Sequence, residues 1–195
     1  MSRLLWCITA VLLLAVSAAA QMETWQIDPA HTAAYFSVRH LGISNVRGTF
    51  TKTSGTVQYD PKNPAKTSID VTIDAASIDT RVEARDKDLR SPNFFDVEKY
   101  PTLTFRSKRV EAADTGHLKV IGDLTIHGVT KEVALEVDGP AAPIKDPRGN
   151  LHMGASAAAK ISRKDFGVSG APMAVGDDVS ITIDVELLKP APAAK

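Results

Sequence analysis

The chain has 195 residues, and its 23 Lys and Arg balance 23 Asp and Glu, so its formal net charge at pH 7 is zero. This length predicts one domain with one core, and the neutral balance gives no electrostatic reason to expect a nucleic-acid partner. An apolar fraction of 44% and a charged fraction of 24% exclude an intrinsically disordered chain.

Residues 1–20 are typical of a secretory signal peptide. Arg3 supplies a positive charge, residues 4–16 form an apolar run, and small residues end at Ala20, where we expect cleavage. The run is shorter than the roughly 20 residues that span a bilayer, so a permanent anchor is the weaker interpretation. The single cysteine, Cys7, lies in this segment. We therefore expect no disulfide, thiolate nucleophile or cysteine-rich zinc site in the mature protein.

Apolar and polar residues alternate repeatedly along the rest of the chain, most clearly over 179–187. A period of two places the apolar side chains on one face of a strand. In chain order, the expected strands cover 25–28, 34–40, 46–59 with a bend near Gly55, 69–74, 103–110, 118–126, 132–137, 151–161 and 179–187. Turn-forming residues at 60–64, 113–116, 127–128 and 139–150 connect them. This pattern predicts an all-β protein with antiparallel strands that close into a barrel or a sandwich.

One segment breaks the alternation and predicts a short helix near residues 80–90. Thr80 and Glu83 have the spacing of a capping box, and Pro92 ends the segment. Asp86 and Arg90 have the spacing of an ion pair.

The expected face of this helix carries two charges. Arg85 and Asp86 share it with Val82 and Leu89. We favour the interpretation that the two charged residues tie the helix to neighbouring loops over a catalytic role.

No catalytic or metal-binding pattern is found along the chain. The five histidines, His31, His40, His117, His127 and His152, have no local metal-ligand spacing, so we expect no metal. Ser169 lacks the flanking glycines of a nucleophile elbow. We therefore expect no catalytic residues and no enzymatic activity.

The expected inward positions include both large and small side chains. One strand presents Met153, Ala155, Ala157 and Ala159 to the interior, and these mostly small groups favour a cavity. The alternative is that Phe36 and Phe50 fill that space. The other inward positions are Phe36, Val38, Val46, Phe50, Val57, Leu103, Phe105, Leu118, Val120 and Ile183.

Several motifs resemble the YceI-like family, from Trp25 to about Leu188. They are 25–31, 36–42, 46–50, 76–80, 85–86 with 89–91, 94–96, 100–101, 122–130 and 163–167. Thr32 and His127 depart from it, since Ser and Arg are common there in the family.

The resemblance implies an eight-stranded antiparallel lipocalin-like barrel over 21–188, exported to the bacterial periplasm, and we expect a disordered tail at 189–195. Its apolar interior would hold a polyisoprenoid or another long-chain amphiphile, without a further cofactor. By the motif match we place apolar ligand-binding residues near the lumen or its lid and expect polar groups at its end. The apolar set is Phe36, Val38, Phe50, Leu89, Phe94, Phe95, Phe105 and Phe166, and the polar set is His40, Arg85 and Asp86. If the backbone at Phe94–Phe95 is extended, one ring points inward and the other outward.

The expected function is a binding or carrier protein for such a lipid. The expected partner is a hydrophobic small molecule, with transient membrane contact and a homodimer through an exposed edge strand as further expectations. Two alternatives stay open: an envelope stress or accessory interaction protein, and a lipid-acting enzyme with His40 and Asp86 as acid and base.

Overall fold

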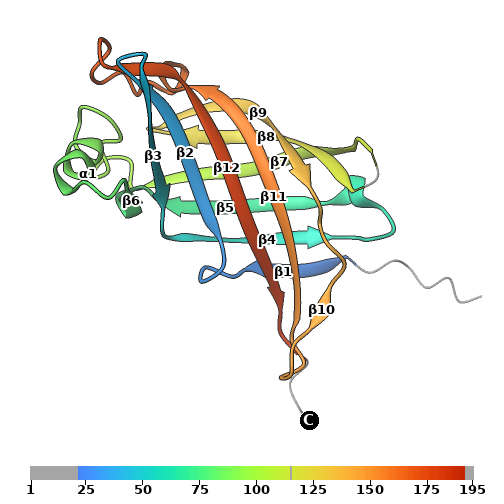
Figure 1. The fold of residues 1–195 in the computed structure, drawn as a ribbon. Helices are drawn as coiled ribbons and strands as arrows, with labels where there is room; N and C mark the ends of the chain where they lie inside the picture. The colour runs from blue at the N-terminus through green and yellow to red at the C-terminus, as the bar shows by residue number, and fades with distance from the viewer. Residues whose placement is uncertain (1–21, 115, 192–195) are drawn as a thin grey trace, which may run out of the picture.

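The computed structural model describes residues 22–114 and 116–191, and it consists mostly of strands (Figure 1). The strands are β1 (Glu23–Ile27), β2 (Ala33–His40), β3 (Ser44–Phe50), β4 (Thr53–Tyr59), β5 (Ser68–Asp74), β6 (Ile78–Asp79), β7 (Thr102–Ala112), β8 (His117–Ile126), β9 (Val129–Asp138), β10 (Ile144–Lys145), β11 (Leu151–Ser162) and β12 (Val175–Lys189). Helix α1 covers Glu83–Arg90, and short 3-10 turns cover Pro64–Lys66, Ala75–Ser77 and Arg163–Phe166. No helix in the described part of the chain is long and apolar enough to cross a bilayer.

The sheet closes on itself. Neighbouring strands follow the order β11-β9-β8-β7-β5-β4-β1-β12, and β12 pairs back with β11 from Ser162↔Asp178 to Leu151↔Lys189. All pairings are antiparallel. The expected eight-stranded antiparallel barrel with one short helix is confirmed. In Figure 1, β2, β12 and β11 cross in front of β4, β5 and β7.

Two sides of the barrel are built from strands that are interrupted rather than continuous. β1 and β2 both pair with β12, so they follow each other along the same edge of that strand. In the next position along the sheet, β3 pairs with β2 and β4 pairs with β1. The expected single strand over 46–59 is therefore wrong in one respect: it is broken at Thr51–Lys52, not bent near Gly55. The backbone amides of Thr51 and Lys52 donate to the carbonyl and hydroxyl of Ser77 instead of to a neighbouring strand.

The turn between β8 and β9 is the tight hairpin expected at residues 127–128. His127 and Gly128 both have positive φ, 52° and 74°, as a two-residue type I′ hairpin turn requires. A Cβ at Gly128 would lie 2.5 Å from the ring of Tyr100, so glycine is needed here for space as well as conformation.

Helix α1 starts later than its sequence suggests. Its N-cap is Val82, and no side chain caps it, so the expected capping box of Thr80 and Glu83 does not form. Thr80 instead uses its hydroxyl to bind the buried carboxylate of Asp86. The expected pair of Asp86 with Arg90 is also absent, because the Arg90 guanidinium donates to the carbonyls of Ala76 and Ile78, which anchor the helix to the barrel.

The core is divided along the barrel axis. One cluster lies at the end covered by α1, here called the α1 end, and includes Phe50, Ile78 and Phe166. A second cluster surrounds Trp25 at the opposite end, here called the β1 end. A third group, around Phe105, Val110, Leu118 and Val120, packs inside β7 and β8. Side chains of these clusters thus pack into both ends of the interior.

The segments expected as signal peptide and tail lie mostly outside the described residues. Residues 1–21 and 192–195 are not described. Lys189, the first residue of the expected tail, belongs to β12, where its ammonium group lies 3.0 Å from the Glu23 carboxylate. The Ala191 amide donates to the Asn150 side chain at 3.1 Å.

Candidate functional site

The barrel encloses an elongated cavity of about 270 Å³. Its lining runs from Leu89 and Phe166 at the α1 end to Tyr59 and Leu187 at the β1 end. Almost every lining side chain is aliphatic or aromatic, because the alternating strands turn their apolar faces inward. The interior is therefore hollow along its length, and its lining is apolar.

The small residues of β11 contribute to this space as expected. Ala155 and Ala157 line the cavity next to Met153, opposite larger groups on other strands. Two residues expected to face the interior, Val46 and Ala159, are not part of the lining. Val46 pairs with Val38, which does line the cavity, so Val46 lies on the same face of the sheet but outside the hollow space.

Aromatic rings narrow the cavity at the α1 end. Phe50 lies 6.0 Å from Phe36 and 5.7 Å from Phe95, measured between ring centroids, with the second pair edge to face. The condition for one ring in and one ring out, an extended backbone, is not met, because residues 92–95 form turns. Phe94 and Phe95 both line the cavity. These rings form a partial lid beneath α1.

The predicted apolar and polar site residues separate in the structure. All eight predicted apolar residues line the cavity: Phe36, Val38, Phe50, Leu89, Phe94, Phe95, Phe105 and Phe166. None of the three predicted polar residues does, since His40, Arg85 and Asp86 are absent from the lining.

Arg85 and Asp86 are engaged in a network around Thr80. Asp86 accepts hydrogen bonds from the Thr80 amide and hydroxyl, and Arg85 donates to the Thr80 hydroxyl and carbonyl. Among the described residues, no hydrogen bond or ion pair links His40 to Asp86. The two residues that would form an acid–base pair are therefore not paired.

Two threonines among the lining residues were not predicted from the sequence. Thr53 and Thr67 line the cavity, and their buried hydroxyls have no hydrogen-bond partner among the described residues. A buried hydroxyl without a partner costs roughly 1 to 3 kcal/mol. Neither hydroxyl oxygen is exposed to the cavity, so both threonines present only carbon atoms to a ligand. Their inward position in alternating strands was a weak signal, because threonine is common on either face of a strand.

Arg163 closes the α1 end from the side of β11 and β12. Its side chain is only 6% exposed, and it donates to the carbonyls of Val168, Gly170, Val175 and Gly176 at 2.8 to 2.9 Å. Burial lowers the pKa of Arg163, although nearby Asp177 opposes this effect. With every one of its nitrogen atoms bonded to carbonyls, this guanidinium fixes the loop before β12 rather than offering charge to a ligand.

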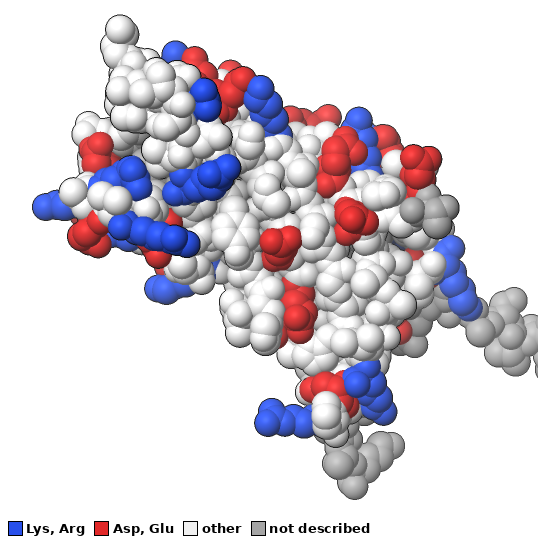
Figure 2. Space-filling model, in the orientation of Figure 1, with Lys and Arg blue, Asp and Glu red and all other residues white. Residues whose placement is uncertain are grey.

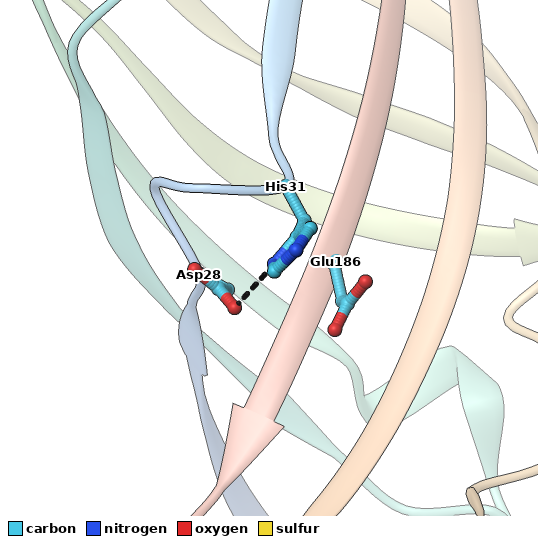
Figure 3. A group of neighbouring side chains, drawn as sticks. All are labelled: Asp28, His31 and Glu186. Carbon is cyan, nitrogen blue, oxygen red and sulfur yellow. Dashed lines mark hydrogen bonds and ion pairs between the residues drawn. The ribbon is translucent and has the colours of Figure 1, made fainter.

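A second group of polar residues lies on the outside of the β1 end. Figure 3 shows Asp28 and His31 on the corner between β1 and β2, with Glu186 of β12 beside them. Nδ1 of His31 lies 2.9 Å from Oδ2 of Asp28. This contact raises the pKa of His31 and lowers the pKa of Asp28.

His152 extends this group along β11. Its Nδ1 lies 2.7 Å from Oε1 of Glu186, and its Nε2 lies 3.3 Å from Oδ2 of Asp146. The bonds to Glu186 and then Asp146 raise the pKa of His152. Partial burial opposes ionisation of Asp146, but hydrogen bonds donated by Asn150, His152 and the Arg148 amide outweigh it and lower its pKa to about 2. Both ring nitrogens of His152 thus face carboxylates.

Comparison with known proteins identifies the family. The model of the YceI-like domain matches residues 25–187. The chain belongs to the YceI-like family. Protein YceI of Escherichia coli O157:H7 is 40% identical over 156 residues, which cover 80% of this chain and 81% of that protein. The match to the family over nearly all of the barrel confirms the resemblance that the motifs indicated.

Solved structures of other proteins share the architecture. Burkholderia cenocepacia BcnA superposes with a TM-score of 0.73 at 25% identity, covering 82% of this chain and 98% of BcnA. A polyisoprenoid binding domain from Saccharophagus degradans has the same fold, with a TM-score of 0.61 at 14% identity, covering 87% of this chain and all of that domain. The YceI-like barrel is therefore retained across large differences in sequence.

Proposed function

We propose that this YceI-like protein binds a long-chain amphiphile, such as a polyisoprenoid, inside the barrel and carries it through the periplasm. The observation that carries the proposal is the continuous apolar cavity of about 270 Å³ between the α1 end and the β1 end. Each methylene that moves from water into such a cavity gains about 0.8 kcal/mol. The polyisoprenoid binding domain of the same fold supports this choice of ligand class.

A carrier differs from a store in that it must exchange lipid with a membrane. A bilayer offers a hydrocarbon tail the same apolar surroundings as the cavity, so near-equal affinity permits transfer in either direction. The surface exposed to the cavity is apolar throughout, so the cavity selects for the hydrocarbon chain of a ligand. We infer a binding protein rather than an enzyme, since His40 and Asp86 do not meet.

Two loops at the α1 end supply a surface for transient membrane contact. Leu41 and Ile43 between β2 and β3 are 57% and 78% exposed, and Met173 before β12 is 92% exposed. The Leu41 amide donates to the carbonyl of Ala174 at 2.7 Å, so the two loops move as one unit. Large apolar side chains exposed together are typical of an interaction site.

One positive charge lies directly beside these loops. Figure 2 shows an uncharged tip at the upper left, with Lys and Arg side chains interspersed with Asp and Glu side chains below it on the side of α1. The Arg39 guanidinium donates to the Gly42 carbonyl at 2.8 Å, which places one positive charge directly beside the apolar tip. The cavity residues Val38 and Val175 lie on the strands that lead to these loops, so lipid would enter from this end.

The decisive experiment is extraction of the exported protein with organic solvent, followed by mass spectrometry of the lipids. We expect one long-chain amphiphile per protein molecule, together with loss of the residue 1–20 segment and recovery from the periplasmic fraction. A protein that yields no lipid after mild purification would instead favour an interaction protein that acts through its outer surface.

A further inference from the structure

The outer surface at the β1 end gathers three metal-ligating side chains from distant parts of the chain. Asp28 and His31 come from the corner between β1 and β2, and Glu186 comes from β12 (Figure 3). One ligand atom from each of the three lies within 4.8 Å of the other two. Glu186 alternates with the cavity residues Val185 and Leu187, so its side chain points outward, away from the lipid cavity.

Backbone contacts hold these three residues in place. The Asp28 amide donates to the Glu186 carbonyl at 2.9 Å, and the Glu186 amide donates to the Thr32 hydroxyl at 3.1 Å. Oδ1 of Asp28 accepts from the Ala30 amide at 2.9 Å, which leaves Oδ2 directed at His31. The corner and β12 thus form one rigid frame, and the ligand atoms need little rearrangement to meet a shared ion.

A chain of outer hydrogen bonds orients the Glu186 carboxylate. His152 holds Oε1 at 2.7 Å, while Asp146 holds the other ring nitrogen of His152 at 3.3 Å. Asp146 is itself fixed by the side chain and amide of Asn150 at 2.9 and 2.8 Å. With Oε1 occupied in this way, Oε2 remains for a cation. Outer partners of this kind are characteristic of metal sites, where they fix the ligands and tune their basicity.

The charge of this surface also favours a cation. Asp28, Asp146 and Glu186 bring three carboxylates together, and within the described ranges 22–114 and 116–191 their ion pairs are with His31 and His152 only. No Lys or Arg among the described residues forms an ion pair with any of these three carboxylates. A divalent ion supplies the missing charge.

We propose that Asp28, His31 and Glu186 form a binding site for a divalent transition-metal ion, for which Zn²⁺ is the matching probe. One imidazole and two carboxylates give three protein ligands, leaving the fourth tetrahedral position to water. Bonds of about 2.0 to 2.2 Å place neighbouring ligand atoms about 3.3 to 3.6 Å apart, so the 2.9 Å between Asp28 Oδ2 and His31 Nδ1 needs only a small expansion. The ion joins the β1–β2 corner to the last strand and stabilises the barrel there.

The test is calorimetric titration of the chelator-treated protein with Zn²⁺, alongside the visible spectrum of bound Co²⁺. We expect one ion per molecule and an unfolding temperature that rises with Zn²⁺ concentration. His31→Ala and Glu186→Gln should each weaken binding at least about 100-fold, and His152→Ala about 10- to 100-fold, as for outer partners elsewhere. His117→Ala is the matched control, because this exposed histidine faces the single carboxylate of Asp138.

The outcomes separate cleanly. Loss of binding in His31→Ala and Glu186→Gln, with circular dichroism of the metal-free variants unchanged and His117→Ala normal, supports the site. Absence of saturable binding would overturn it, as would an affinity that His31→Ala leaves unchanged. Because the lipid content of the protein is measured independently by extraction, this result does not depend on the proposed carrier function.

Discussion

The hydroxyl of Thr80 donates a hydrogen bond to the buried carboxylate of Asp86, six residues further along the chain. The same carboxylate accepts from the Thr80 amide at 2.9 Å, and Arg85 donates to the Thr80 hydroxyl at 2.7 Å. This closed network fixes α1 to the edge of the barrel, directly over the aromatic rings that narrow the cavity.

Asp86→Ala should therefore destabilise the protein substantially. It leaves the Thr80 amide and hydroxyl buried without their acceptor, at a cost of about 2 to 4 kcal/mol. Urea unfolding followed by circular dichroism measures the change in the free energy of unfolding. Glu98→Ala is the control, since Glu98 is exposed and should change stability by less than about 0.5 kcal/mol. Equal effects of the two substitutions would show that the network contributes nothing.

A large side chain at Ala157 should block lipid binding without opening the barrel. Ala157 lines the cavity, and its neighbour Ala158 points outward from the same strand. Ala157→Trp fills part of the roughly 270 Å³ interior, so we expect affinity for a fluorescent fatty-acid probe to fall at least about tenfold, or about 1.4 kcal/mol. Ala158→Trp adds the same side chain outside and should bind normally. If both variants bind the probe as the parent does, the ligand lies elsewhere.

Most strands could be predicted from the sequence because the alternation that marks a strand is local, whereas alternation left a barrel and a sandwich open and only the family resemblance implied the barrel. Along 179–187 apolar residues mark the inner face of the strand and polar residues mark the outer face. The whole stretch lies within β12. The break at Thr51–Lys52 has no such local signal, since it depends on hydrogen bonds to Ser77, which is distant in sequence.

In the candidate sites, too, residues with a local sequence signal were predictable and residues joined by long-range contacts were not. The aromatic lining was predictable from motif and alternation, whereas the role of Thr80 depends on Asp86 being buried beside it. His31 and Glu186 are too far apart in the sequence for any spacing pattern to join them. Only the pairing of the first and last strands brings them together.

The exposed apolar loops at the α1 end should determine membrane binding. Burying a side chain such as Ile43 in a bilayer interface contributes up to about 2 kcal/mol, and an aspartate there loses this and adds repulsion from anionic lipid. We expect Ile43→Asp and Met173→Asp each to lower the fraction bound to phosphatidylglycerol vesicles about tenfold in a sedimentation assay. Ile144→Asp is the matched control: Ile144 is 69% exposed but lies on β10, which pairs with the β1-end portion of β11. A comparable loss in that control would mean that the α1 end has no special part in binding.

The buried hydroxyls of Thr53 and Thr67 should cost stability without taking part in ligand binding. Thr53→Val and Thr67→Val replace each hydroxyl with a methyl of similar size, removing a buried group that has no partner among the described residues. The ligand-free variants should therefore be as stable as the parent, or more stable by about 1 kcal/mol. Because neither hydroxyl oxygen is exposed to the cavity, binding of a long-chain alcohol and binding of the matching alkane should change to the same extent. Thr182→Val, on the exposed face of β12, should alter neither ligand. Parallel changes for alcohol and alkane would show that the hydroxyls act only through packing, whereas a selective loss of the alcohol would show that the cavity recognises a polar group along with the hydrocarbon chain.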